Sequence, residues 1–197
     1  DVYKRQTLRD LERYQRINVI GTSGSGKSTI AKNLGAALHL PYYEMDALFW
    51  KPDWVESTDE EFFPKVERVA EQSRWILDGN YSRTFAIKLN RVQLLVWIDL
   101  PFLITTYRVT RRAIKRSISS EELWSGNRET LRKAFLSKDS IILWSMTHHR
   151  STRDKYANLM HSEAYGDIAF LRLSSRDQIA RLLNSKSLKP PPHHRYS

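Results

Sequence analysis

The nine residues from Gly21 to Thr29 read GTSGSGKST and match the Gly-x4-Gly-Lys-Ser pattern of a phosphate-binding loop. In this pattern the glycines let backbone N–H groups turn toward phosphate oxygens, the lysine pairs with the β- and γ-phosphates, and the serine hydroxyl binds Mg²⁺. The apolar run 17–20 precedes the loop directly and a segment of helical periodicity follows it. We therefore expect ATP and Mg²⁺ as cofactors, with Lys27 also catalytic and the nucleotide bound by Gly21, Thr22, Ser23, Gly24, Ser25, Gly26, Lys27, Ser28 and Thr29.

Two aspartates follow apolar runs, where the carboxyl ends of parallel strands would meet. Asp78, in WILDGNYSR, is expected to face Mg²⁺ and its waters opposite Ser28, although it also suits the start of a turn before Gly79. Asp46 follows the run 41–45. A hydroxyl acceptor gains from a carboxylate that takes its proton, whereas a monophosphate acceptor needs no base. Asp46 is therefore expected to be catalytic and to contact the acceptor, and its alternative role is to cap the next helix.

Two tryptophans follow Asp46 closely. Trp50 and Trp54 flank the pair Pro52-Asp53, which favours a turn between them. Aromatic rings in this position would stack on a nucleobase or a sugar, and they would serve equally well in the core. We expect both rings to contribute to acceptor binding.

The formal net charge is +10, and most of it lies between residues 105 and 155, where twelve Lys and Arg face five Asp and Glu. Arg108, Arg112 and Arg116 recur every four residues, so they share one face of a helix. Guanidinium groups pair bidentately with phosphate oxygens and stabilise the transition state of phosphoryl transfer. We expect Arg108 to bind the nucleotide and Arg112 to be catalytic. The alternative is a solvated cationic face.

Short apolar runs alternate with helical segments along the chain. The runs are rich in β-branched or aromatic residues and occupy 17–20, 41–45, 74–77, 92–98 and 167–173. Between the first two runs, Ile30, Leu34, Ala37 and Leu38 share one helix face. This alternation predicts an α/β fold in three layers, with a five-stranded parallel sheet flanked by helices.

The 197 residues, 41% of them hydrophobic, suit one domain, which we expect at 7–186. Residues 1–6, DVYKRQ, read like a translated sequencing adapter and are expected to be an artefact that replaces the natural start. The end of the chain, SLKPPPHHRYS, predicts a disordered tail over 187–197. The sequence has no cysteine, no apolar run long enough to span a bilayer and no signal-peptide pattern, and we expect a cytoplasmic protein.

The combination of GTSGSGKST with MDALFWKPDW, WILDGNY, WIDLP and SGNRE resembles the adenylate kinase-like P-loop kinases. Within them it is most similar to the small proteins known as DNA topology modulation or adenylate kinase-related proteins. The similarity runs from about 17 to 183. It implies a P-loop NTPase fold of the nucleoside and nucleotide kinase type, with an Arg-rich helical lid over about 117–156.

For the acceptor, the resemblance makes Arg83 indicate a monophosphate and Asp46 indicate a hydroxyl group. Arg83 stands at an offset comparable with that of the arginine that grips an acceptor phosphate, although Asn80 and Tyr81 replace the Phe-Pro of the family. A plain surface position is its alternative. Glu44-x-Asp46 resembles the Asp-x-Asp of nucleoside, shikimate and gluconate kinases, which favours a hydroxyl acceptor. The choice between a hydroxyl and a monophosphate therefore stays open.

On the nucleotide side, the resemblance implies roles for four arginines. Arg108 and Arg112 match arginines of the helix that follows the fourth strand, and Arg128 is expected to be catalytic by closing over the phosphates from the lid. Arg176 follows the last strand, where related kinases wrap a loop around adenine. The alternative there is an ordinary helix cap by Ser175.

Two functions follow from these observations. The first is an ATP- and magnesium-dependent phosphotransferase acting on a nucleoside, a nucleotide or another small hydroxyl compound. The second is a nucleic-acid-associated ATPase, because a basic surface binds phosphate backbones. Cations lining a cleft favour the kinase, whereas a flat external patch favours nucleic acid. The sequence contains no NKxD segment to read guanine, so a regulatory GTPase is disfavoured.

Overall fold

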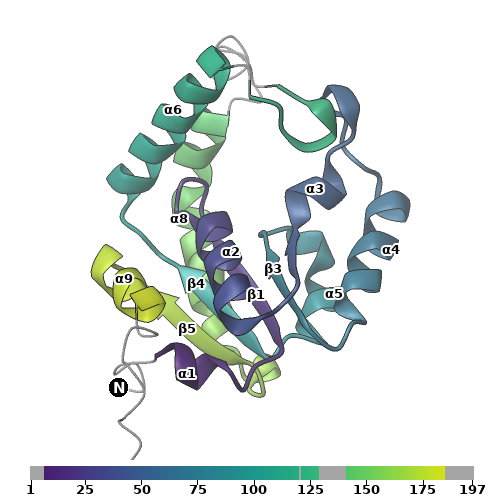
Figure 1. Ribbon diagram of the computed structural model, residues 1–197, viewed down its shortest axis with the longest axis vertical. Coiled ribbons are helices and arrows are strands. Elements are labelled where there is room, and N and C mark those ends of the chain that lie inside the picture. The colour runs from purple at the N-terminus through teal and green to yellow at the C-terminus, as the bar shows by residue number, and fades with distance from the viewer. Residues whose placement is uncertain (1–6, 120, 129–140, 185–197) are drawn as a thin grey trace, which may run out of the picture.

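The computed structural model describes residues 7–119, 121–128 and 141–184, and contains one five-stranded sheet (Figure 1). The strand order is β2-β3-β1-β4-β5, and every neighbouring pair is parallel. The strands are β1 (Arg16–Gly21), β2 (Tyr42–Glu44), β3 (Trp75–Asp78), β4 (Leu94–Ile98) and β5 (Ala169–Leu173). All five predicted strands are present, and the predicted α/β class with a parallel sheet is confirmed.

Helices pack on both faces of this sheet (Figure 1). One face is covered by α1 (Leu8–Leu11), α2 (Lys27–Leu38) and α9 (Arg176–Asn184). The other is covered by α3 (Met45–Phe49), α4 (Asp59–Ala70), α5 (Phe85–Leu89) and α8 (Ile141–Met160). Among the described residues a further helix, α6 (Phe102–Ser119), packs against α8. Short turns of 3₁₀ helix there are η1 (Pro52–Trp54), η2 (Ser82–Thr84), η3 (Trp124–Gly126) and η4 (Glu163–Tyr165).

Alternation of side chains along the strands produces these two cores. In β1, Ile17 and Val19 join the core under α2, while Ile20 joins the core on the opposite face. Within α2, Leu34 is fully buried and Ala37 packs at the margin of the same core, as the helical spacing predicts. Both faces of the central strand are thus buried, which is characteristic of parallel sheets.

The parallel arrangement brings the carboxyl ends of all strands to one edge of the sheet. The phosphate-binding loop follows the central strand β1, and Asp78 is the last residue of its neighbour β3. Glu44, the last residue of β2, pairs in register with Asp78. The chemistry-bearing segments predicted from the sequence therefore meet along this edge.

The Arg-rich helix predicted after the fourth strand is α6. Val109 and Ala113 are buried on one side of it, and the predicted basic stripe lies on another. The predicted lid, about 117–156, takes in the end of α6, η3 and most of α8, while residues 120 and 129–140 lie outside the described residues. The predicted artefact at 1–6 and the predicted tail at 187–197 lie outside them as well. None of the helices in the described ranges combines the length and the apolar character that crossing a bilayer demands.

One buried charge is unexpected on a short helix. Lys88 of α5 has no exposed surface, and its Nζ lies 3.4 Å from the Sδ of Met45 and 3.5 Å from the carbonyl oxygen of Gly79. No carboxylate among the described residues forms a salt bridge with it. Burial, with a smaller contribution from the charge of Lys155, lowers the pKa of Lys88 from its ordinary value of 10.5 to about 7.

The substitution Lys88→Met is expected to stabilise the protein near neutral pH. The unfolded chain holds the lysine proton up to about pH 10, while the folded chain releases it near pH 7, so folding of the wild type becomes more favourable as pH rises through this window. The variant lacks this dependence. We expect it to melt about 4 °C or more above the wild type at pH 6, and the gap to shrink by pH 9. Thermal unfolding at both pH values checks this, with Lys115→Met on the exposed side of α6 as the control. A gap that stays constant with pH would contradict the buried charge.

Candidate active site

The phosphate-binding loop is a tight turn that packs against α6. Gly24 has φ +77°, in the left-handed region that favours glycine. A Cβ added there would lie 2.2 Å from the carbonyl oxygen of Thr105 and 2.7 Å from a methyl carbon of Val109. The loop therefore touches the α6 backbone so closely that only glycine fits, and α6 fixes the position of the loop.

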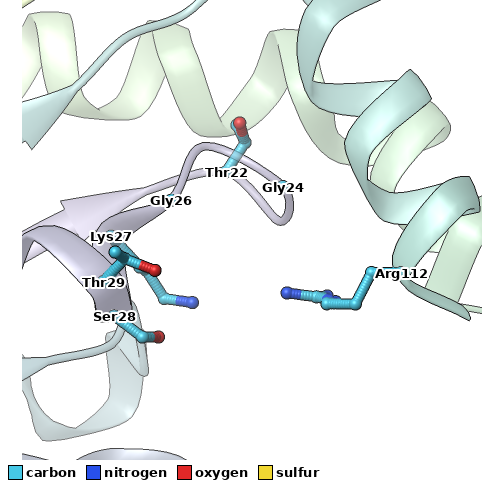
Figure 2. Close-up of a pocket in the computed structure, with 7 residues that line it drawn as sticks. All are labelled: Thr22, Gly24, Gly26, Lys27, Ser28, Thr29 and Arg112. Atoms are coloured by element: carbon cyan, nitrogen blue, oxygen red, sulfur yellow. The ribbon is translucent and has the colours of Figure 1, made fainter. Parts of the chain in front are cut away.

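A small pocket opens directly over this loop (Figure 2). Figure 2 shows Lys27 and Arg112 extending toward each other from opposite sides of the pocket, with the Ser28 hydroxyl beside Lys27. The two cations come from α2 and α6, which the chain separates by more than sixty residues. The pocket is lined by Thr22, Gly24, Gly26, Lys27, Ser28, Thr29 and Arg112.

A further arginine, Arg108, contacts the loop. The guanidinium of Arg108 donates a hydrogen bond of 3.2 Å to the backbone oxygen of Ser25. Burial and the charge of Arg176 lower the pKa of Arg108, which places Arg176 within electrostatic reach. Arg108 is partly buried and Arg176 is exposed. Their like charges repel, and a polyanion between them would relieve this repulsion. The structure therefore brings Arg108 and Arg112 of α6 to the phosphate loop, with Arg176 within electrostatic reach of Arg108.

Asp78 lies at the end of β3 and is 2% exposed. Burial raises the pKa of its carboxyl, while the charge of Lys27 and a hydrogen bond with the Ser28 side chain act in the opposite direction. One oxygen, Oδ2, has no hydrogen-bond partner. A buried carboxylate oxygen without a partner, beside the serine of the phosphate loop, fits a bound Mg²⁺ or one of its waters. Ser28 and Asp78 are the residues that would hold the ion.

Asn80 is a site residue that the sequence did not predict. Its Nδ2 donates to the carbonyl oxygen of Gly21 at 2.8 Å, and its Oδ1 accepts from the N–H of Gly21 at 3.1 Å. One side chain thus satisfies both backbone groups of the first residue of the loop. The sequence does show that Asn80-Tyr81 stands where the adenylate kinase-like kinases have Phe-Pro. That difference alone does not indicate a hydrogen bond from Asn80 to Gly21.

Asp46 lies in the first turn of α3, and its Oδ1 accepts a hydrogen bond of 2.6 Å from the phenol of Tyr81. No side-chain cap is formed at this helix start, so the alternative role of Asp46 as a helix cap has no support here. The pKa of Tyr81 is raised by burial and by the negative charge of Asp46. Tyr81 therefore keeps its proton and donates it to this hydrogen bond at ordinary pH.

Arg83 is engaged with its own neighbours. Its guanidinium forms a salt bridge of 2.9 Å with Asp59 and lies over the rings of Phe49 and Phe62, 5.0 and 6.0 Å from their centroids. The side chain remains 41% exposed. To grip an acceptor phosphate, it would have to exchange Asp59 for the phosphate.

Trp50 and Trp54 join a chain of aromatic contacts that ends on η3. Their ring centroids are 5.4 Å apart, and the ring of Trp54 lies 6.4 Å from that of Trp124. Asn127, which is 3% exposed, accepts from the N–H of Trp54 at 2.7 Å and donates to the carbonyl oxygen of Lys51 at 2.8 Å. The two tryptophans thus bind the segment 121–128 to the turn after α3, and both rings keep some exposed surface.

Arg128 belongs to this same contact. Its carbonyl oxygen accepts from the Nε1 of Trp54 at 3.1 Å, and its guanidinium lies 3.7 Å from the carboxylate of Glu122. It is not among the residues that line the phosphate-loop pocket. A catalytic role for Arg128 would thus require the segment 121–128 to move, and that role stays a prediction.

No family model matches the chain, and no curated protein matches it. A shikimate kinase from Bacteroides thetaiotaomicron superposes with a TM-score of 0.54 at 15% identity, over 88% of this chain and 97% of that one. A shikimate kinase from Acinetobacter baumannii in complex with shikimate gives 0.52 at 16%, over 92% and 99%. One from Aquifex aeolicus vf5 gives 0.51 at 15%, over 87% and 93%.

The chain shares its fold with these three shikimate kinases. The match extends over nearly the whole length of each of these proteins, so the shared fold includes the sheet and the helices on both faces. At these identities the likeness concerns the fold alone.

The substitution Lys27→Ala is expected to weaken binding of MgATP by about 10-fold to 100-fold, because it removes a charged partner of the phosphates. Isothermal titration measures this directly. Lys32→Ala, an exposed position on the same helix, is the matched control and should bind as the wild type does. Unchanged MgATP affinity in Lys27→Ala would contradict nucleotide binding at this loop.

The substitution Asp78→Asn is expected to change the pH dependence of stability. Because the folded-state pKa of Asp78 is raised, the ligand-free wild type loses stability as pH rises from about 4 through the raised value, and Asp78→Asn does not. The free energy of unfolding of the variant should therefore exceed that of the wild type increasingly between pH 4 and neutrality. Urea unfolding across this range measures the difference. A difference that falls as pH rises would show that Asp78 is stabilised as an anion in the ligand-free protein.

Proposed function

We propose that the protein is an ATP- and magnesium-dependent phosphotransferase that moves the γ-phosphate of ATP to a hydroxyl group of a small acceptor. The observation that carries this proposal is the common strand edge, where the phosphate loop, Asp78 and Asp46 meet. Nucleotide binding alone requires the loop only. A second carboxylate besides the one suited to magnesium, here Asp46 two residues after the end of β2, is what a hydroxyl acceptor needs.

In this proposal each residue has a separate task. Lys27 and Arg112 hold the outer phosphates from opposite sides, and Arg108 and Arg176 hold the rest of the nucleotide. Asp46 takes the proton of the acceptor hydroxyl while the oxygen of that hydroxyl forms a bond to the γ-phosphorus. The bond from that phosphorus to the bridging oxygen breaks, and ADP leaves.

Magnesium supplies charge neutralisation on the phosphate oxygens when it is bound. Ser28 and Asp78 would hold it, since they lie together and the Asp78 carboxylate has an oxygen without a partner. Burial of Asp78 disfavours its charged form in the ligand-free protein, so binding of the cation stabilises that charge.

A hydroxyl acceptor is favoured over a monophosphate by the contacts of Arg83. The residue that would grip a second phosphate is paired with Asp59 at 2.9 Å, whereas Asp46 is already fixed by a hydrogen bond. Shikimate, named as the ligand of one structural neighbour, and gluconate are hydroxylated acids and are reasonable test acceptors together with nucleosides.

The nucleic-acid-associated ATPase gains no observation in its favour. Arg108 and Arg112 lie at the phosphate loop, and Arg176 is within electrostatic reach of Arg108, so these cations lie where a kinase needs them. Proposed DNA topology modulation activity would need a separate cationic surface.

The substitution Asp46→Asn is expected to lower the rate of transfer to a hydroxyl acceptor by about 100-fold or more, because it removes the base and keeps the shape. ADP release in the presence of MgATP is measured with adenosine, shikimate, gluconate and AMP as acceptors. Asp154→Asn, exposed on α8, is the matched control. Transfer to AMP alone, unaffected by Asp46→Asn, would overturn the hydroxyl acceptor and restore a phosphate-binding role for Arg83.

A further inference from the structure

Tyr81 is the residue that touches the proposed base. Its phenol donates to Oδ1 of Asp46 over 2.6 Å, a short hydrogen bond to a carboxylate. Among the described residues no hydrogen bond to the other oxygen, Oδ2, is formed. One carboxylate oxygen is therefore occupied, and the second is left for another proton donor.

The ring of Tyr81 packs against two aromatic rings that also contact each other, with the centroids of Phe49 and Phe62 5.1 Å apart. The ring of Tyr81 lies 4.8 Å from that of Phe49 and 5.1 Å from that of Phe62, and both phenylalanines are buried. Tilted and edge-on contacts of this kind fix the ring plane. Because the ring cannot turn without losing these contacts, the hydroxyl keeps one direction.

The backbone of Tyr81 is also tied to the phosphate loop. The preceding residue, Asn80, bonds both backbone groups of Gly21, and the N–H of Gly79 donates to the carbonyl oxygen of Val19 at 3.1 Å. Three consecutive residues thus connect the start of the loop with the carboxylate of Asp46. The position of that carboxylate relative to the γ-phosphate depends on this connection.

We propose that Tyr81 is the positioning residue of the acceptor site, which holds the Asp46 carboxylate so that Oδ2 takes the proton of the acceptor hydroxyl. The inference rests on the proposed function, since it assigns Asp46 the role of base. Tyr81 itself neither gains nor loses a proton in the reaction. Its effect on the rate passes entirely through Asp46.

A residue that serves only to fill space behaves differently from a positioning residue. Tyr81→Phe keeps the ring and its contacts with Phe49 and Phe62, and removes only the hydroxyl. If Tyr81 acts through Asp46, removing its hydroxyl matters only while the carboxylate is present. Tyr43→Phe is the matched control, since that hydroxyl bonds the Gln72 side chain away from Asp46.

The test is a double-mutant cycle of Tyr81→Phe and Asp46→Asn. MgATP is supplied with adenosine, shikimate, gluconate or water as acceptor, and kcat, KM and the ATP dissociation constant are measured. We expect Tyr81→Phe to lower kcat by about 10-fold to 100-fold with ATP affinity within about twofold of the wild type. In the Asp46→Asn background the same change should alter kcat by less than about twofold.

The possible outcomes distinguish failure of the positioning role of Tyr81 from failure of the proposed phosphotransferase function. Full activity in Tyr81→Phe, or effects that multiply in the double variant, would overturn the positioning role and leave the phosphotransferase intact. If Asp46→Asn itself transfers phosphate to these acceptors at the wild-type rate, or if ATP is only hydrolysed and no small acceptor is phosphorylated, then the proposed function fails and this inference fails with it. A loss of ATP affinity in Tyr81→Phe equal to its loss of kcat would assign the residue to the phosphate loop instead.

Discussion

The double hydrogen bond between the Asn80 side chain and the backbone of Gly21 is the contact on which the rest of the site depends. It joins the end of β3 to the start of the phosphate loop at the centre of the sheet. Asp78 lies two residues before Asn80 and Tyr81 lies one residue after it, so a single segment aligns the magnesium ligand, the loop and the acceptor side. The segment is held by backbone contacts to β1, which is buried on both faces and therefore rigid.

Charges around this segment are balanced poorly in the ligand-free protein. Arg108 and Arg176 carry like charges within electrostatic reach of each other, while Asp78 is a buried acid near Lys27 and Ser28. A polyphosphate relieves the first imbalance and a divalent cation relieves the second. MgATP carries both. The proposed substrate would thus remove these unfavourable electrostatic interactions. MgATP should therefore bind better than ATP or Mg²⁺ alone.

The sequence predicts this much because its signals are local. Strand positions, the faces of α2 and the phosphate loop follow from residue spacing over short stretches, and all five strands lie where they were predicted. The contacts of Asn127 with Trp54 join residues seventy-three positions apart, and no spacing within either segment indicates them. The burial of Lys88 could not be predicted either, because a lysine on a short helix is usually exposed to solvent. The sequence does not decide whether Trp50 and Trp54 pack in the core or contact a ligand. In the structure they are partly exposed and lie in the aromatic contacts that reach η3.

The central claim is that phosphate passes from ATP to a carbon-bound hydroxyl. Phosphorus NMR tests it most directly, because the γ-phosphate of ATP moves to a resonance that differs for a phosphate monoester, a new anhydride and free phosphate. With MgATP and a panel of nucleosides and sugar acids, a monoester signal should grow together with the two signals of ADP. Free phosphate alone, released faster when duplex DNA is added, would contradict the account.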